Sequence, residues 1–394
     1  MKAPKPVSRR HVFYVPGYDP RGPLHYHRLY REESLKQGAV NGLAVSTDKR
    51  RNIDDVESQW TVTADGVTTT YSFLRYEDII RQHWPASAAP MYAAILGYAW
   101  SFTRNGVYAM ILRNASPTFL AVIYPPLVVV LSFLAAMVLW ILTAALLSFV
   151  AGPLAWLVTA PLLGLPLLLY RRLETRLNAF WLARSCAFLV RRSRGEVAGI
   201  EERCTAFAER IAEALRKEDN DEVLVIGHSV GAHLAITVAA RALERMNEGM
   251  CIRLLTLGQS IAMTPDEPAA AQFRADLLAV AASPRVKWID VTSAIDGSCI
   301  PLTDPLATSR ALRPEGVAVQ PKLVSARFNT MFSADTYALM RRDYFRVHFQ
   351  YLMATEMPGD YDYFLITAGN RSLEDRFAHL DSVTDFHRFR MGKT

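Results

Sequence analysis

Cysteine is scarce in this sequence, and its spacing argues against a metal site. The 394 residues contain only Cys186, Cys204, Cys251 and Cys299. Structural zinc sites usually have C-x-x-C pairs or paired His residues. None of the four cysteines forms a C-x-x-C pair or has paired His residues nearby. We therefore expect no metal and no other cofactor. We interpret the four residues as reduced thiols in a protein core, which fits a reducing compartment.

Charge is missing from a long central stretch. Between Asn114 and Tyr170 the chain has no Asp, Glu, Lys or Arg. Because a spanning helix needs about 20 apolar residues, this stretch is long enough for two. We expect a transmembrane hairpin over 114–172, with helices at about 118–147 and 151–170. Two helices buried in a soluble core are the alternative, although a globular domain would rarely hide so long an uncharged stretch.

Basic residues flank the uncharged stretch and are absent from its turn near 151–153. Arg104 and Arg113 precede it, and Arg171, Arg172 and Arg176 follow it. Under the positive-inside rule both ends of the hairpin face the cytoplasm. The first ten residues also lack the apolar segment of a secretory signal. We therefore expect an integral protein of the inner (cytoplasmic) membrane, with the lipid bilayer as its partner.

Repeats, low-complexity segments and concentrated basic patches are also missing. The net charge of +6 is spread along the chain, without the interleaving of basic and aromatic residues that is typical of nucleic-acid binding. We therefore do not expect nucleic acid as a partner. The pattern gives no indication of the oligomeric state.

A nucleophile motif follows a short apolar run. Residues 223–231 read Val-Leu-Val-Ile-Gly-His-Ser-Val-Gly, and a stretch rich in small and aliphatic residues follows at 232–243. This order predicts a buried strand, a tight turn and a helix. A serine at such a turn stands clear of its neighbours, which lets it meet a base. Ser229 is therefore the candidate nucleophile, with Gly227 and Gly231 leaving room for the turn.

With this strand, motif and helix, the chain resembles the α/β-hydrolase superfamily, and more narrowly its membrane-anchored lipase and esterase-like members of bacterial type. The resemblance covers residues of about 10–40 and 200–355. It implies an α/β fold with a mostly parallel sheet and helices on both faces, here with an inserted transmembrane hairpin. It also implies that an acid and then a His follow the Ser, and that Val230 supplies one backbone N–H of an oxyanion hole.

The second oxyanion donor is expected in an early loop. A predicted strand at 12–15 ends in Pro16-Gly17. This loop is similar to the superfamily's early glycine loop, which implies that the backbone N–H of Tyr18 is the second donor. A plain Pro-Gly turn is the alternative interpretation. Asp19, beside the loop, fits the role of a turn former equally well.

The acid is expected beyond two further strands, predicted at 252–257 and 286–291. Asp296 lies in the loop after the second strand, where superfamily members often carry the acid. Asp290 is the rival, but it falls inside the strand pattern, where a buried carboxylate needs a partner. Asp304 precedes a proline and fits a turn. The choice between Asp296 and Asp290 stays open.

His348 is the candidate base. It follows a strand predicted at 322–328 and precedes an expected closing helix, which matches the place of the superfamily's His. His228 and His233 lie near the Ser in sequence but are poorly placed as a base. We interpret His379 and His387 as imidazoles with ordinary partners.

These assignments predict acyl transfer. His348 would accept the proton of Ser229 as it attacks a carbonyl, and Asp296 would hold the imidazole's tautomer. We expect a membrane-anchored serine hydrolase that cleaves a small acyl ester or a lipid; a thioester or an amide stays open. The alternative is a catalytically silent scaffold that acts as a membrane-bound binding or assembly module. A transporter would need intramembrane charges, which the two spans lack.

Four regions follow from this interpretation. Residues 1–85 form the first part of the hydrolase domain, with the oxyanion loop and a β-hairpin around Asp65-Gly66. Residues 86–113 form an amphipathic segment that lies either in the membrane interface or on the hydrolase core. Residues 114–172 form the transmembrane hairpin. Residues 173–394 form the main part of the hydrolase domain, with the Ser-Asp-His triad.

Overall fold

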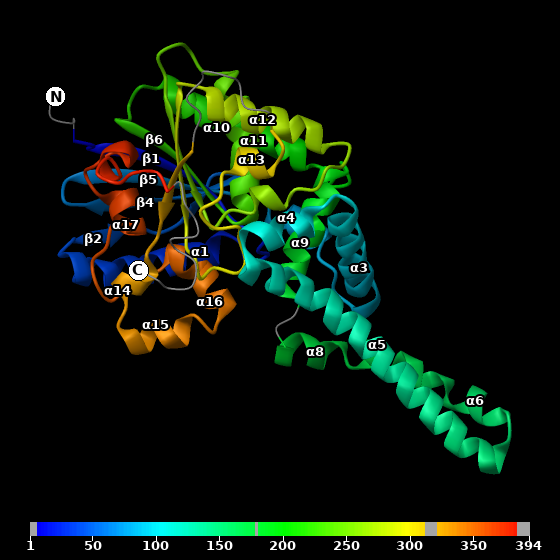
Figure 1. The fold of residues 1–394 in the computed structure, drawn as a ribbon. Helices are drawn as coiled ribbons and strands as arrows, with labels where there is room; N and C mark the ends of the chain where they lie inside the picture. Colours follow the sequence, from blue (N-terminus) through cyan, green and yellow to red (C-terminus); the bar gives the residue numbers. More distant parts are fainter. Residues whose placement is uncertain (1–5, 178–179, 312–320, 384–394) are drawn as a thin grey trace.

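The computed structural model describes residues 6–177, 180–311 and 321–383, and it has one mixed β-sheet between two layers of helices (Figure 1). His387 and the side chain of Arg176, which belong to the expectations above, lie outside what is described. The strands are β1 (Arg9–Val15), β2 (Val45–Thr47), β3 (Arg51–Asn52), β4 (Glu57–Ala64), β5 (Val67–Leu74), β6 (Glu222–His228), β7 (Ile252–Leu257), β8 (Val286–Thr292) and β9 (Lys322–Ser325).

The sheet joins two blocks that are far apart in sequence. Its order is β2-β4-β5-β1-β6-β7-β8-β9, with β3 paired to β4. All strands from β5 to β9 in this order run parallel, and β4 is antiparallel to β5. Val12 of β1 pairs with Tyr71 of β5 on one side and Leu224 of β6 on the other. Because β1, β6, β7 and β8 are parallel neighbours, their carboxyl ends lie beside one another at the same edge of the sheet.

Helices cover both faces of the sheet. On one face the core includes Phe207 and Leu234, and on the other it includes Tyr30 and Trp60. The helices of the body are α1 (Pro23–Asn41), α2 (Glu77–Gln82), α9 (Trp181–Ser193), α10 (Ile200–Arg216), α11 (Val230–Leu243), η2 (Ile261–Met263), α12 (Ala270–Ala282), α13 (Pro305–Thr308), α14 (Phe328–Met331), α15 (Ala334–Met340), α16 (Tyr344–Phe349), η3 (Gln350–Leu352), α17 (Tyr363–Ala368) and α18 (Leu373–Arg376). The expectation of an α/β fold with a mostly parallel sheet is confirmed.

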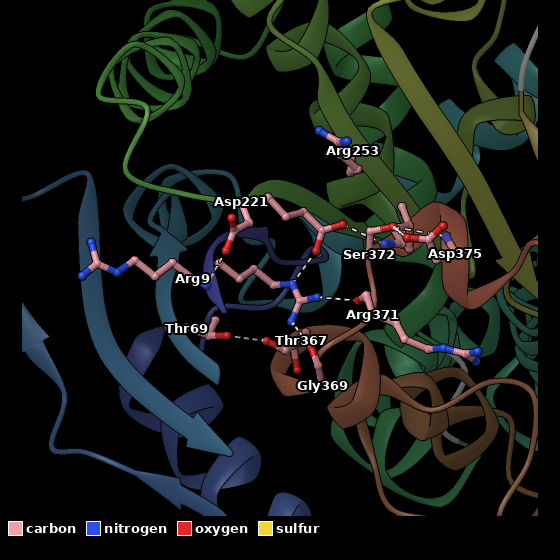
Figure 2. Close-up of polar contacts among 12 residues, drawn as sticks. Arg9, Thr69, Asp221, Arg253, Thr367, Gly369, Arg371, Ser372 and Asp375 are labelled. Atoms are coloured by element: carbon pink, nitrogen blue, oxygen red, sulfur yellow. Dashed lines mark hydrogen bonds and ion pairs between the residues drawn. The ribbon is translucent and has the colours of Figure 1, made fainter. Parts of the chain in front are cut away.

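A buried ion pair fastens the C-terminal segment to the amino end of the sheet. Arg10 is 1% exposed, and its Nε donates to Glu222 Oε2 at 2.5 Å. Its two other nitrogens donate to the carbonyl oxygens of Gly369 and Arg371 at 2.8 and 2.7 Å, as Figure 2 shows. The contacts tie β1, β6 and the segment after α17 together. The opposite, carboxyl end of these strands is left for the candidate site.

The predicted β-hairpin forms the antiparallel edge of the main sheet. Strands β4 and β5 pair from Glu57 with Leu74 to Ala64 with Val67. Asp65 and Gly66 make the turn, with φ values of 45° and 82°. A two-residue turn with positive φ at both positions matches the right-handed twist of the two strands that it joins. The strand expected at 322–328 is shorter than predicted, because Phe328 already begins α14.

The amphipathic segment expected at 86–113 forms α3 (Ala88–Arg104) and α4 (Val107–Asn114). One face of α3 is buried in the body's core, where Met91, Ile95 and Phe102 are fully covered. Trp100, on its other face, is 67% exposed. The segment therefore packs on the body through one face, which is the second of the two expected positions. Its other face exposes apolar side chains to the surroundings.

An apolar helical hairpin projects from the body (Figure 1). Its first arm is α5 (Ser116–Ala151), and its second consists of α6 (Leu154–Thr159), η1 (Ala160–Gly164), α7 (Leu165–Leu168) and α8 (Tyr170–Leu177). Both arms, taken as Ser116–Ala151 and Leu154–Thr175, are long and apolar enough to cross a membrane. The first arm extends beyond the expected 118–147 at both ends, and Pro125 and Pro126 lie inside α5 without ending it, as expected of prolines in a membrane helix.

Candidate active site

Ser229 lies in a strained turn between β6 and α11. Its φ of 57° and ψ of −124° are unusual for a residue with a side chain, and such strain costs about 1–3 kcal/mol. Its N–H donates to the carbonyl of Leu257 in β7 at 2.9 Å, which holds the turn. A Cβ on Gly227 would lie 2.5 Å from Ala232 Cα, and one on Gly231 would lie 2.2 Å from Pro16 O. Both elbow positions therefore require glycine.

The early loop lies directly against Ser229. A Cβ on Gly17 would lie 3.1 Å from Ser229 Cβ, so the loop backbone and the serine are in contact. The hydroxyl of Tyr76 donates to the carbonyl oxygens of Pro16 and Gly17, at 2.7 and 2.9 Å, and these hydrogen bonds hold the loop in place. The side chain of Tyr76 is fully buried, and burial raises its pKa well above the usual value. The phenol therefore stays a donor.

Two backbone N–H groups beside the serine are candidates for an oxyanion hole. Within the described part of the chain the N–H of Tyr18 has no acceptor. Val230 is the first residue of α11, and such an N–H has no acceptor within its own helix. Both groups belong to residues next to Gly17 and Ser229, which touch. Both N–H groups therefore lie beside the serine, where a developing negative charge would need donors.

Asp19 has a larger part than turn formation. Its carboxylate accepts hydrogen bonds from Arg21 Nη2 at 2.6 Å and from the Tyr26 hydroxyl at 2.9 Å. Burial raises the pKa of this carboxyl, but the bonds and charge of Arg21 outweigh burial, so the net pKa lies below its usual value. The ring of Tyr18 packs on Phe188 of α9, with the centroids 4.6 Å apart. The early loop is thus held on both sides.

His348 and Asp296 form a buried pair. His348 Nδ1 lies 2.9 Å from Asp296 Oδ2, and each residue is 1% exposed. Asp296 also accepts from the Tyr351 hydroxyl at 3.1 Å and from the Ser298 N–H at 2.9 Å. Burial raises the pKa of Asp296, but the His348 imidazole and these donors outweigh it and lower the net pKa. The carboxylate is therefore ionised and directed at His348.

The two rival carboxyl groups lie elsewhere. Asp290 is inside β8, where the Thr256 hydroxyl donates to its Oδ1 at 2.5 Å. Burial raises the pKa of Asp290 to about 7. Asp304 is the N-cap of α13 and accepts the N–H of Leu306 at 2.9 Å. Of the three candidates, only Asp296 contacts His348 in the described structure.

The other nitrogen of His348 is free to act as a base. A carboxylate is acceptor-only, so Nδ1 must donate to Asp296, and in the neutral imidazole the lone pair is then on Nε2. This Nε2 is buried and has no hydrogen-bond partner among the described residues. It is therefore not bonded to the Ser229 hydroxyl in this structure. Catalytic hydrogen bonds of this kind are often long without substrate and tighten in the complex.

Two residues that the sequence did not single out for the site hold this pair in place. His228 Nε2 lies 2.9 Å from the carbonyl oxygen of His348, and their rings are 4.8 Å apart. Burial, together with His348, lowers the pKa of His228 to about 3, so its ring is neutral. Gly258 has a φ of 50°, and a Cβ there would lie 2.8 Å from the Tyr351 ring and 3.1 Å from Asp296 Oδ2. The sequence signal that could have pointed to Gly258 is its position directly after β7, the strand that pairs with β6 before Ser229.

Two other histidines that were weighed from the sequence have partners of their own. His233 Nδ1 contacts Arg192, and its ring stacks on Phe273 at 3.6 Å. His379 Nε2 lies 3.1 Å from Asp360 Oδ1. Neither contacts the serine or the Asp296 loop.

The loop that carries Asp296 rests on the first turn of α5. The Thr118 hydroxyl donates to the carbonyl of Cys299 at 2.5 Å. A Cβ on Gly297 would lie 3.6 Å from the carbonyl oxygen of Pro117, so the helix and the loop are close there as well. Cys299 is a free thiol, as are the three other cysteines. The apolar hairpin and the candidate site therefore share a contact.

No family model matches this chain, and neither a curated protein nor a solved structure is similar to it. The chemistry of these residues is therefore inferred from their own geometry.

Proposed function

We propose that this protein is a serine hydrolase of the α/β-hydrolase type, anchored in a membrane by its apolar hairpin, which cleaves an acyl ester. The observation that carries the proposal is the buried His348–Asp296 pair with its open Nε2, because the His348 ring lies 4.8 Å from that of His228, the residue just before the strained Ser229.

The mechanism begins with attack of Ser229 Oγ on the ester carbonyl carbon. His348 Nε2 accepts the hydroxyl proton, and the carbonyl electrons move to the oxygen, which becomes an oxyanion. Collapse of this intermediate breaks the bond to the alcohol, which leaves with the proton from His348. Water, deprotonated by His348, then releases the acid from the acyl-serine by the same steps.

The N–H groups of Tyr18 and Val230 would stabilise the oxyanion. Loss of one such donor typically costs about 3–4 kcal/mol in the transition state. Tyr76 supports this role indirectly, because its hydroxyl reaches the carbonyls of Pro16 and Gly17 and holds the peptide that precedes Tyr18. Asp296 would offset the positive charge that His348 gains during the reaction.

The hairpin supports a position at a membrane. Arginines flank it on the side of the body, at Arg113, Arg171 and Arg172, and none lies in its turn. This pattern favours a body on the cytoplasmic side of the inner membrane. A site fixed at the bilayer would meet lipid or acyl esters at high local concentration.

A second candidate function is a catalytically silent scaffold that binds a partner at the membrane. The specific observation that favours it is the missing hydrogen bond between Ser229 and His348. The two candidates differ in the nucleophilicity of Ser229, which a covalent probe measures directly.

The test is labelling by a fluorophosphonate in the full-length protein in detergent. The wild type should be labelled at Ser229, and Ser229→Ala should not be labelled at all. Ser260→Ala, which removes another buried serine beside the same sheet edge, is the matched control and should be labelled like the wild type. Equal labelling of the wild type and Ser229→Ala would reject the hydrolase and favour the scaffold.

A further inference from the structure

An apolar groove lies between the hairpin and the body. It encloses a cavity of about 730 Å³, within the range of small-molecule sites. Its wall on the hairpin side is made by α5, through residues that include Leu120, Ile123 and Leu127. The opposite wall includes Trp181 of α9 and Phe345 of α16. Figure 1 shows that these helices meet where α5 leaves the body.

The inner end of the groove lies one layer of side chains from the acid and base of the candidate site. The Trp181 ring lies edge-on to the His348 ring, with the centroids 5.4 Å apart. Trp181 also contacts Phe345 in the same wall, at 5.1 Å. Ser298, another lining residue, donates its N–H to Asp296. A molecule in the groove is therefore separated from the acid–base pair by a single layer of side chains.

We propose that this groove binds the acyl chain of a long-chain ester that enters from the bilayer, so that the spanning helix α5 is itself one wall of the substrate site. The inference rests on the proposed hydrolase function. It adds the substrate class, an ester of a long apolar chain held in a membrane. It also gives the hairpin a role in specificity beyond anchoring.

The continuity of α5 is the argument for this occupant. The groove residues Leu120 and Leu127 are 62% and 47% exposed, and the same helix continues with Leu131 and Val138, at 59% and 51%. One apolar helix surface thus runs from the candidate site along the segment that is suited to the hydrocarbon core. A chain that moved along it from the bilayer would stay in contact with apolar side chains throughout, at little cost in hydration.

The experiment compares two identical substitutions one helical turn apart. Leu127→Trp places a large ring in the groove, and Leu131→Trp places the same ring on α5 just beyond it. The full-length proteins, in detergent micelles or bilayer nanodiscs, are assayed with p-nitrophenyl acetate, octanoate and dodecanoate. Labelling by a short-chain fluorophosphonate reports in parallel whether Ser229 is reactive.

In the wild type kcat/KM should rise roughly threefold to fourfold per added methylene until the groove is full. Leu127→Trp should lower kcat/KM for the dodecanoate by about tenfold or more and leave the acetate within about twofold. Leu131→Trp should leave both within about twofold.

Three results would overturn the inference while the hydrolase function stands. The first is a flat dependence on chain length with Ser229 still labelled, and the second is an equal effect of the two tryptophans. The third is a change in oligomeric state with Leu127→Trp alone, which would make the groove an interface for a second copy. Loss of both labelling and acetate hydrolysis in the wild type would instead reject the proposed function.

Discussion

The body and the hairpin solve the burial of polar groups in opposite ways. In the body, polar side chains from distant segments bond one another, as Asp296 does with His348 and Tyr351. In the hairpin, hydroxyl groups turn back onto their own helix. Ser132 donates to Val129 O at 2.7 Å, and Ser148 to Ala145 O at 2.6 Å. The second arrangement needs no neighbour and suits a helix surrounded by lipid.

The difference teaches where a substitution should matter. A residue of the body's carboxyl edge contacts several loops at once, so a single atom added there disturbs all of them. A residue of the outer hairpin contacts little of the protein. Four substitutions test this contrast, beginning with the one that should have the largest effect.

Gly258→Ala should abolish most of the activity. The new Cβ would meet the Tyr351 ring and Asp296 Oδ2, and the φ of 50° is unfavourable for alanine. We expect kcat/KM for an ester to fall by about a hundredfold or more. Gly97→Ala in α3, where a Cβ meets nothing within 4 Å, is the control and should keep full activity. Equal activities of the two variants would show that the edge is not tightly packed.

Asp290→Asn should stabilise the protein, and more at high pH than at low pH. The folded pKa is about 7 against an ordinary value of 3.8, so the folded state binds the proton more tightly than the unfolded state. Ionisation therefore lowers wild-type stability as pH rises from about 4 to 7. The loss is up to about 1.4 kcal/mol for each pH unit that separates the folded pKa from the unfolded pKa.

Thermal unfolding near pH 8 and near pH 5 measures this effect. The rise in Tm caused by Asp290→Asn should be larger near pH 8. Asp55→Asn changes an exposed carboxyl and should give no such difference between the two pH values. A rise in Tm independent of pH would show that the Asp290 carboxyl titrates normally.

Tyr351→Phe should weaken the acid–base pair without removing it. The variant loses the hydrogen bond to Asp296. It also leaves the Ser293 N–H, which in the wild type donates to the Tyr351 hydroxyl at 2.8 Å, without an acceptor. We expect about a tenfold loss in kcat/KM, because such changes cost roughly 1–3 kcal/mol. Tyr337→Phe in α15 is the matched control and should keep wild-type rates. Unchanged kinetics in Tyr351→Phe would mean that His348 and Ser298 suffice to orient Asp296.

Thr118→Val acts at the seam between the two regions. It removes the hydrogen bond from α5 to the Cys299 carbonyl and keeps the shape of the side chain. The expected result is a loss of about 1 kcal/mol in stability and a reduction of about threefold in kcat. Leu142→Ala, in the exposed outer part of α5, should change neither. If Leu142→Ala has the larger effect on kcat, the contrast between body and hairpin fails.

Much of the fold could be predicted from local pattern. The uncharged stretch indicated two apolar helices, and the run before Ser229 indicated β6 and its turn. The order of elements pointed to Asp296, in the loop after β8, and to His348, which lies in the short helix α16, and these two side chains contact each other. The helix ends were less predictable, because no charged residue marks them inside the uncharged stretch, and α5 extends beyond the expected 118–147 at both ends.

The support around the candidate site was not predictable. The contact of His228 with the His348 backbone joins residues 120 positions apart. The glycine at 258 looks like an ordinary strand end until Tyr351 and Asp296 are placed against it. Neither contact is reflected in the hydrophobic periodicity or in a motif of the sequence. The contact of Thr118 with the Asp296 loop was hidden for the same reason.

The length of α5 has a consequence for where a lipid would be cut. Its 36 residues extend roughly 54 Å, whereas the hydrocarbon core of a bilayer is about 30 Å thick. In the proposed orientation the outer 20 or so residues fill that thickness, and the surplus, which includes Leu120 and Leu127, stands above it. The first turn of α5, which contacts the Asp296 loop, would then lie roughly 20 Å above the hydrocarbon core, beyond a headgroup layer of about 5–8 Å. A long acyl chain would therefore have to move along α5 out of the leaflet before its ester reached the candidate site.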